Sequence, residues 1–271
     1  MLDVIKAIIY GIVQGITEWL PISSTGHLII IQDFLPINMS PEFMEMFNVV
    51  IQLGSIMAVV VLYFNKLNPF ASNKSEVEKK ETYTLWMKVL VASLPAAIIG
   101  LAFDDFIDEH FFNPLVVSIM LILYGVIFIL VERHNKTTKP YFTSLKSLTI
   151  KAALLIGVFQ VLALIPGTSR SGATIIGALL LGAARPVAAE FTFFLAIPVM
   201  FGASLLKLVR FGFHFTGLEI LVLLVGSITA FVVSILAIRF LMNFIKKNDF
   251  TSFGYYRIVL GIIILLLMFI R

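Results

Sequence analysis

Two short polar stretches interrupt an otherwise apolar sequence, and they contain the residue types that bind and transfer phosphate. The first, residues 21–27, reads PISSTGH. Ser24 in this stretch is a potential nucleophile, and His27 can exchange a proton near neutral pH. Ser23 and Thr25 beside them add hydroxyl groups that can donate hydrogen bonds to an anion. The first stretch therefore predicts a nucleophile with a base close by.

The second stretch, residues 166–174, reads PGTSRSGAT. Arg170 can donate two parallel hydrogen bonds to phosphate oxygens. Ser169, Ser171 and Thr174 surround it with hydroxyl groups, and a helix that begins near Ser171 would direct free backbone N–H groups at an anion. The two stretches together predict nucleophilic phosphoryl transfer, in which positioning and charge stabilisation supply most of the rate.

An acidic residue, Glu18, precedes the first stretch and adds a third kind of chemistry. A carboxylate at membrane depth is costly, so it indicates a functional site. Glu18 can orient a base or bind a divalent cation, Mg²⁺ or Ca²⁺. Gln14 lies four residues earlier, on the same face of a helix. Glu18 is predicted to be both a catalytic residue and the metal ligand.

The composition indicates an integral membrane protein. Of 271 residues, 59% are hydrophobic and 13% charged, and the mean hydropathy is +1.01. The chain has no cysteine, which excludes thiol nucleophiles, disulfides and cysteine-bound metals. The net charge of +4 predicts no nucleic-acid partner, because the basic residues are distributed as topology signals. The first apolar segment has no cleavage signature and is interpreted as part of the mature protein.

The apolar segments predict an all-α membrane fold built on an inverted repeat. Ten of them begin near residues 3, 22, 43, 84, 115, 147, 171, 189, 218 and 255. A spanning helix needs roughly 20 apolar residues, and the second and seventh segments are too short and follow a proline. Each is therefore paired with the segment before it as a re-entrant hairpin. The prediction is two halves, each a re-entrant helical hairpin followed by three transmembrane helices.

The charges of the connecting loops predict the topology. Three loops are basic and one is acidic: Lys66, Lys74, Lys79 and Lys80; Arg133, Lys136, Lys139 and Lys146; Lys246 and Lys247; and Asp104, Asp105, Asp108 and Glu109 within 103–114. Basic loops lie preferentially in the cytoplasm. With three membrane-spanning helices after each hairpin, all three basic loops lie on the cytoplasmic side. Because three is an odd number, the second half is inverted relative to the first, and both termini lie outside. The runs 74–81 and 133–146 are interpreted as solvated loops.

Internal similarity supports pseudo-repeats of about 1–131 and 147–271 within a single membrane domain. Residues 20–26 align with 165–172 after one insertion, and an acidic-phenylalanine pair precedes Gly54 and Gly202 by the same interval. Inverted repeats with broken helices are typical of secondary transporters. A transporter or flippase for an anionic lipid is therefore an alternative to an enzyme.

Residues 14–27 and 166–174 resemble the two signatures of the bacterial undecaprenyl-diphosphate phosphatases, the bacitracin-resistance type. The resemblance covers essentially the whole chain, including residues 50–55 (VIQLGS). It implies a plasma-membrane enzyme, with its active site accessible from the extracytoplasmic face, that hydrolyses undecaprenyl diphosphate to the monophosphate and inorganic phosphate. Such an enzyme recycles the lipid carrier of cell-wall synthesis and confers bacitracin resistance, with a divalent cation.

The same resemblance implies roles for individual residues. Ser24 matches the proposed nucleophile, His27 the base, Arg170 the phosphate-binding arginine and Glu18 the second acidic residue of the glutamate-rich motif. Gln14 occupies the first position of that motif, where many relatives have glutamate, and the resemblance implies that it contacts the substrate. Attack by Ser24 through a phosphoserine and direct attack by water are both open.

Other features carry weaker predictions. Another class of lipid phosphatase, related to vanadium haloperoxidases, needs a histidine followed by an aspartate after its arginine motif. The only histidine after Thr174 is His214, and no aspartate follows it closely, so the sequence argues against this class. Small residues such as Gly177 and Gly182 permit close packing within or between chains, which leaves a homodimer open. Five polar residues are expected to line the cavity or to cap interfaces: Glu42, Glu45, Asn48, Gln52 and Gln160. Three phenylalanines are expected to pack inside the protein or to face lipid: Phe191, Phe193 and Phe194.

Overall fold

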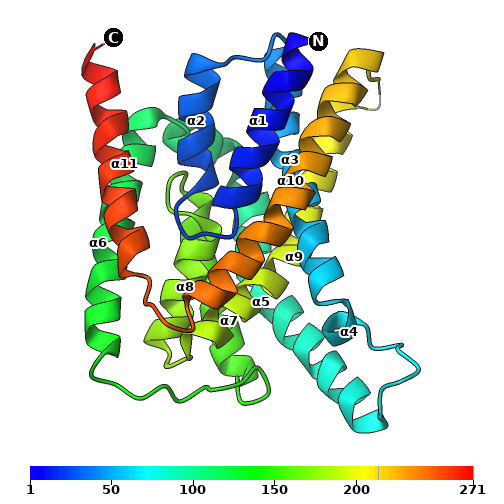
Figure 1. Cartoon of the computed structure of the whole chain (residues 1–271), viewed down its shortest axis with the longest axis vertical. Helices are drawn as coiled ribbons and strands as arrows, with labels where there is room; N and C mark the ends of the chain where they lie inside the picture. Colours follow the sequence, from blue (N-terminus) through cyan, green and yellow to red (C-terminus); the bar gives the residue numbers. More distant parts are fainter. Residues whose placement is uncertain (213, 271) are drawn as a thin grey trace.

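The structure, a computed structural model, describes residues 1–212 and 214–270, and the side chains of all of these except Asp104, Asp105, Asp108, Phe269 and Ile270. The described chain is a bundle of helices joined by loops (Figure 1). The helices are α1 (Leu2–Thr17), α2 (Ser24–Phe34), α3 (Pro41–Leu62), α4 (Phe64–Leu67), α5 (Glu76–Phe111), α6 (Pro114–Asn135), α7 (Ile150–Val161), the 3-10 turn η1 (Leu162–Leu164), α8 (Arg170–Leu180), α9 (Arg185–Phe211), α10 (Gly217–Phe244) and α11 (Thr251–Ile270).

Polar caps fix where most of the long helices begin. The side chains of Ser40, Ser75, Asn113, Thr149 and Thr216 each accept a hydrogen bond from the backbone N–H three residues further on. Such caps satisfy one of the amide groups that have no partner in the first turn of a helix. Proline at the first position of α3 and of α6 adds a preformed backbone angle.

In the described part of the chain, six helices are long and apolar enough to cross a membrane: α3, α5 over Glu76–Phe103, α6, α9, α10 and α11 over Thr251–Met268. Three of them follow each pair of short helices, α1 with α2 and α7 with α8, as the sequence predicted. The two hairpins open toward opposite ends of the bundle, and the start of α1 and the upper part of α11 lie at the same end (Figure 1). The inverted relation of the two halves stays a prediction.

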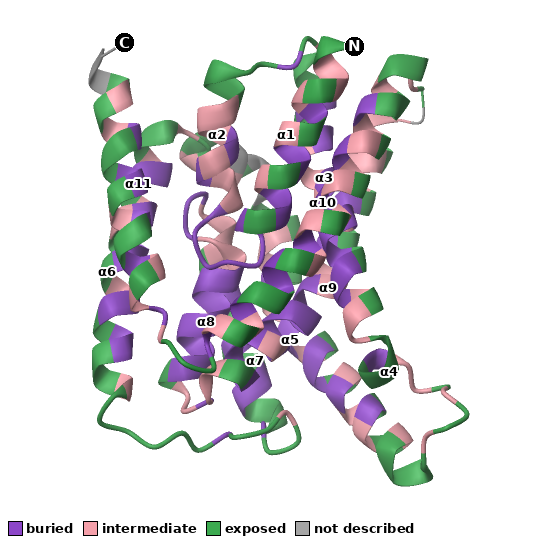
Figure 2. Ribbon diagram, viewed as in Figure 1, coloured by how far each residue is buried: buried purple, intermediate pink, exposed green. Residues whose placement is uncertain are grey.

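The outer surface of the bundle is apolar, as a surface in contact with lipid must be. On α10 the exposed residues recur every three or four positions: Leu221, Leu224, Ile228, Val232, Leu236 and Phe240 are 47–62% exposed. This stripe runs along the outer side of α10 (Figure 2). A soluble protein would cover such a continuous apolar face. The pattern therefore supports the membrane interpretation independently of helix length.

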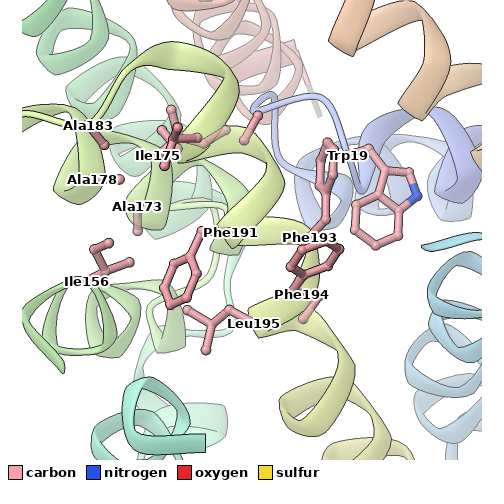
Figure 3. Packing of buried hydrophobic residues seen from close by; sticks show 14 of the residues in the cluster. Trp19, Ile156, Ala173, Ile175, Ala178, Ala183, Phe191, Phe193, Phe194 and Leu195 are labelled. Atoms are coloured by element: carbon pink, nitrogen blue, oxygen red, sulfur yellow. The ribbon is translucent and has the colours of Figure 1, made fainter. Parts of the chain in front are cut away.

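The main core lies around the second hairpin and α9. Phe191, Phe193 and Phe194 are fully buried there, and Phe193 packs edge-on against Trp19 with 5.2 Å between ring centroids. Figure 3 shows Trp19, from the tip of the first hairpin, beside the α9 phenylalanines. Of the two roles expected for these phenylalanines, packing is confirmed and contact with lipid is wrong.

Two segments interpreted as loops are helical. Residues 76–81 form the first turns of α5, because Ser75 and Glu78 make a capping box in which each side chain bonds the other's backbone N–H. At its other end α5 continues to Phe111. The acidic segment therefore belongs mostly to a helix, and the side chains of Asp104, Asp105 and Asp108 lie outside the described part of the chain.

The three basic segments lie together at one end of the molecule, as predicted. Lys146 pairs with Glu81 of α5 at 2.7 Å, and Lys136 pairs with Asp249, before α11, at 3.3 Å. This end lies opposite the start of α1 (Figure 1). That it faces the cytoplasm stays a prediction.

Glycine allows the closest helix contacts, and two glycines at corresponding repeat positions give a direct test. A Cβ on Gly54 would lie 2.1 Å from the carbonyl oxygen of Ser227 in α10, whereas a Cβ on Gly202 would meet nothing within 4 Å. We expect Gly54→Ala to force α3 from α10 and to lower the stability by about 1–3 kcal/mol or more. Gly202→Ala is the matched control and should melt like the wild type. Thermal unfolding in detergent measures both, and equal melting temperatures would contradict the packing described.

Candidate active site

The tips of the two hairpins have the same unusual backbone. Ser23 and Ser169 have φ of 71° and 72°, and they are the only residues other than glycine with positive φ in the described chain. Each caps a helix of 11 residues, with its hydroxyl accepting from the N–H of Gly26 or Gly172. A serine in this region costs about 1–3 kcal/mol, and such strain is concentrated at functional sites. The shared geometry also places Ser24 and Arg170 at equivalent positions.

Glu18 joins the two tips. Its carboxylate accepts hydrogen bonds from Arg170 Nη2 at 3.1 Å, from Ser24 Oγ at 3.2 Å and from Gln14 Nε2 at 2.9 Å. The side chains of Arg170 and Glu18 are only 11% and 6% exposed, so this ion pair is weakly screened by solvent. The acid that neutralises Arg170 thus comes from a position 152 residues away in the sequence. The predicted gathering of Glu18, Ser24 and Arg170 is present in the structure.

His27 lies at the same tip but does not contact Ser24. Its Nδ1 lies 2.7 Å from the carbonyl oxygen of Ser23, and its Nε2 lies 2.8 Å from the hydroxyl of Tyr256 in α11. The two rings are stacked with 5.6 Å between centroids. Among the described residues, the group that bonds Ser24 Oγ is Glu18 rather than His27. Neither the predicted His27–Ser24 contact nor an orienting contact from Glu18 to His27 is present.

Two further hydroxyls of the second stretch support the turn. Ser171 Oγ donates to the backbone oxygen of Glu18 at 3.1 Å, and Thr174 Oγ1 donates to the backbone oxygen of Arg170 at 2.9 Å. Both residues are buried. These bonds hold Arg170 and Glu18 in register, and the predicted contacts of Ser171 and Thr174 with substrate stay predictions.

A cavity of about 210 Å³ opens at the meeting point of the tips. Its polar lining is Glu18, Ser24, Thr25, Gln52, Gln160, Ser169 and Arg170. The lining does not include the other predicted site residues, Gln14, Ser23, His27, Ser171 and Thr174. Pockets for whole small molecules usually measure 300–1,000 Å³. The cavity is therefore suited to a polar head group, with any long tail outside it.

A larger cavity, of about 620 Å³, lies at the basic end and contains none of the motif residues. Several of its lysines are already engaged: Lys66 pairs with Glu190 at 2.6 Å, Lys146 with Glu81 at 2.7 Å, and Lys88 donates to the carbonyl oxygen of Leu145 at 3.0 Å. The smaller cavity is lined by Ser24, Glu18 and Arg170, so it is the candidate active site.

Arg257 in α11 is a residue of this site that the sequence analysis missed. It is fully buried, and it donates to the backbone oxygens of Pro21 at 3.2 Å and of Gly167 and Thr168 at 2.9 Å each. It therefore ties both hairpin tips to one helix. Within the described chain it has no ion pair with a carboxylate. The available signal was a lone arginine inside an apolar span, which is rare without a function.

The residues around Glu18 fit a divalent cation only if the cation also binds phosphate oxygens. No group of three or more His, Cys, Asp or Glu residues in the described chain could hold a metal ion. Among the described residues, Glu18 is the only carboxylate in the cavity lining, and the buried Oε1 of Gln14 has no hydrogen-bond partner. Mg²⁺ commonly binds one or two carboxylates together with substrate phosphates. Glu18 and Gln14 are the residues that would hold it.

Comparison with known proteins places these features in a family. The profile of a family described as "Bacitracin resistance protein BacA" matches residues 7–263. Undecaprenyl-diphosphatase of Enterococcus faecalis is 65% identical over 96% of this chain and 95% of its own length. The proteins of the same name from Acetivibrio thermocellus and Desulfitobacterium hafniense are 64% and 57% identical, each over 98% of this chain and over 98% and 96% of their own lengths.

Proposed function

Because the chain belongs to the bacitracin resistance protein BacA family, we propose that it is a membrane phosphatase that hydrolyses undecaprenyl diphosphate to undecaprenyl phosphate and inorganic phosphate. Relatives at 57–65% identity over nearly the full length carry the name undecaprenyl-diphosphatase. The observation that carries the proposal is the hydrogen-bonded group of Ser24, Glu18 and Arg170 at one cavity.

The geometry supports nucleophilic attack by Ser24. Its Oγ already donates to Glu18, so Glu18 is the group placed to accept the proton as the new O–P bond forms. The bond between the terminal phosphorus and the bridging oxygen breaks, and undecaprenyl phosphate leaves with that oxygen. Glu18 passes the proton from Ser24 to the leaving undecaprenyl phosphate. Water then attacks the phosphoserine and gives a proton to Glu18, the bond between phosphorus and Ser24 Oγ breaks, and inorganic phosphate is released as the proton on Glu18 moves to Ser24 Oγ. Direct attack by water, with Ser24 only binding phosphate, is the alternative.

Arg170 stabilises the charge that develops on the transferred phosphoryl group. Its Nη2 and Nη1 bond Glu18 and the backbone oxygen of Thr192, while its buried Nε has no partner in the described structure. A preorganised cation in a site that excludes water is worth more than the same charge in water. A divalent cation, when bound by Glu18, would supply further charge neutralisation at the phosphate oxygens.

His27 serves this site through position. Its contacts with the Ser23 carbonyl and with Tyr256 hold the first turn of α2 against α11. That turn carries Ser24, so His27 fixes the direction of the nucleophile. In the proposed mechanism this positioning role takes the place of the direct proton transfer expected from the sequence, which stays untested.

The cellular role follows from the reaction and the topology. We place the protein in the bacterial plasma membrane with the basic end in the cytoplasm, because basic segments lie preferentially on that side. The first hairpin enters from the opposite, extracytoplasmic side, and the substrate reaches the cavity from there. Dephosphorylation would recycle the lipid carrier of cell-wall synthesis and confer bacitracin resistance.

The test is phosphate release from undecaprenyl diphosphate by the detergent-purified protein, with Mg²⁺, Ca²⁺ or EDTA. A substrate labelled in its terminal phosphate, quenched in acid during turnover, should leave label on the wild type and none on Ser24→Ala. Release without labelled protein would favour direct water attack. Lipid binding without any release, in a folded protein, would contradict the phosphatase and favour a carrier.

A further inference from the structure

Gln160 is a buried polar side chain with no partner, and it lines the active-site cavity. It is 2% exposed, and neither its Nε2 nor its Oε1 has a hydrogen-bond partner in the described structure. Most buried side-chain polar groups are paired, because an unpaired one loses its bonds to water without replacement. The other glutamine of the lining, Gln52, donates to the backbone oxygen of Asn48 at 3.3 Å. The Gln160 amide can therefore form hydrogen bonds with a ligand in the cavity, because no described protein group occupies its donor and acceptor.

The relation between the two hairpins explains why Gln160 is unpaired. Gln14 precedes the capping Ser23 by nine residues, and Gln160 precedes the capping Ser169 by the same interval. Gln14 donates to Glu18, four residues further along. The residue four positions after Gln160 is Leu164, whose side chain cannot accept a hydrogen bond. The first glutamine thus supports a catalytic acid, and its counterpart faces the cavity without such a partner.

We propose that the Gln160 amide binds the lipid-linked phosphate of the substrate, the one that is not transferred. This inference rests on the proposed function. A diphosphate places two phosphate groups in one small cavity. Ser24, Glu18 and Arg170 act on the terminal one, so the second must be bound by the polar lining that remains. Gln160 supplies N–H donors there.

The neighbours of Gln160 and its lack of charge fit this subsite. Ala163 and Leu164 from the same hairpin, and Val199 and Met200 from α9, add apolar lining to the same cavity. They would meet the first part of the prenyl chain, which is attached to this phosphate. An uncharged donor also binds phosphate more weakly than an arginine does. Weak binding on this side lets the monophosphate product leave.

Product inhibition separates the two phosphate subsites. Undecaprenyl phosphate occupies the lipid-linked subsite, whereas inorganic phosphate occupies the terminal one. The variant is Gln160→Met, which keeps the length of the side chain and removes the amide. Its matched control is Ile156→Leu, one turn earlier on α7, which is fully buried, lies outside the cavity lining and keeps its volume. Gln160→Glu is a second variant of the same shape that repels phosphate.

We expect Gln160→Met to raise the inhibition constant for undecaprenyl phosphate, and the KM for the diphosphate, on the order of tenfold or more, since a hydrogen bond to a charged group is lost. The inhibition constant for inorganic phosphate should not change. The melting temperature without ligand should hold or rise, because the variant removes an unpaired polar group. A residue that only supports the fold would lower it.

The controls keep this inference separate from the proposed function. If wild type and Ile156→Leu do not hydrolyse the diphosphate, the proposed function fails. If they do, and Gln160→Met and Gln160→Glu keep the wild-type inhibition constant for undecaprenyl phosphate, the subsite is wrong. Equal rises in both inhibition constants would also overturn it, because Gln160 would then act on the site as a whole.

Discussion

Glu18→Gln is expected to lower the rate of phosphate release by roughly a hundredfold to ten-thousandfold, the range lost with a general base. The amide keeps the shape of the side chain and can still accept a hydrogen bond from Ser24 Oγ. It cannot take the proton, because it has no negative charge. His27→Gln should cost much less, since in the structure His27 bonds the Ser23 carbonyl and Tyr256 rather than Ser24.

Turnover at saturating substrate, measured side by side for the two variants, checks this order. Both proteins should first be shown to be folded by thermal unfolding in detergent. A larger loss for His27→Gln than for Glu18→Gln would reinstate the histidine as the base, and would mean that its ring turns toward Ser24 when substrate binds.

Arg170→Ala is expected to lower turnover by about a thousandfold or more, in line with the loss of an arginine that stabilises a phosphoryl transition state. The same change leaves Glu18 buried without its cation, which should destabilise the protein by about 3–5 kcal/mol. Arg170→Lys should recover part of the stability and little of the rate. Lysine restores a charge but not the planar fork that binds two oxygens at once.

A double variant separates the two effects of Arg170. Glu18→Gln combined with Arg170→Ala removes both charges, so its melting temperature should rise above that of Arg170→Ala alone. Its phosphate release should stay as low as that of the weaker single variant. Recovery of activity together with stability would contradict both the role of Glu18 as the base and the role of Arg170 in stabilising charge.

The architecture followed from local features of the sequence. Each of the ten predicted apolar segments corresponds to a helix, since hydropathy and length determine what can cross a bilayer. Prolines and polar caps at Ser40, Asn113 and Thr216 determined where helices begin. The error at α5 has the same local origin: Ser75 and Glu78 form a capping box that extends the helix into a charged segment interpreted as a loop.

The site was predicted in part. Ser24 and Arg170 lie in polar stretches of an otherwise apolar chain, where polar side chains are costly and indicate a functional site. Residue type and spacing were therefore enough to select both as candidates. The sequence also indicated Glu18, whose expected contact with His27 is absent, whereas its predicted roles in catalysis and in metal binding stay predictions. Which group would bond Ser24 depended on the directions of side chains at the hairpin tip, and His27 turns toward α11 instead.

Only the tertiary structure determined the connections between distant residues. Glu18 pairs with Arg170 across 152 positions, and Arg257 holds carbonyl oxygens of both tips although its own sequence surroundings are apolar. The sequence likewise cannot show that Gln160 has no hydrogen-bond partner, because this depends on which side chains the neighbouring helices place beside it. Local patterns fix the helices and their ends, whereas the partner of a buried polar group is fixed by how the helices pack.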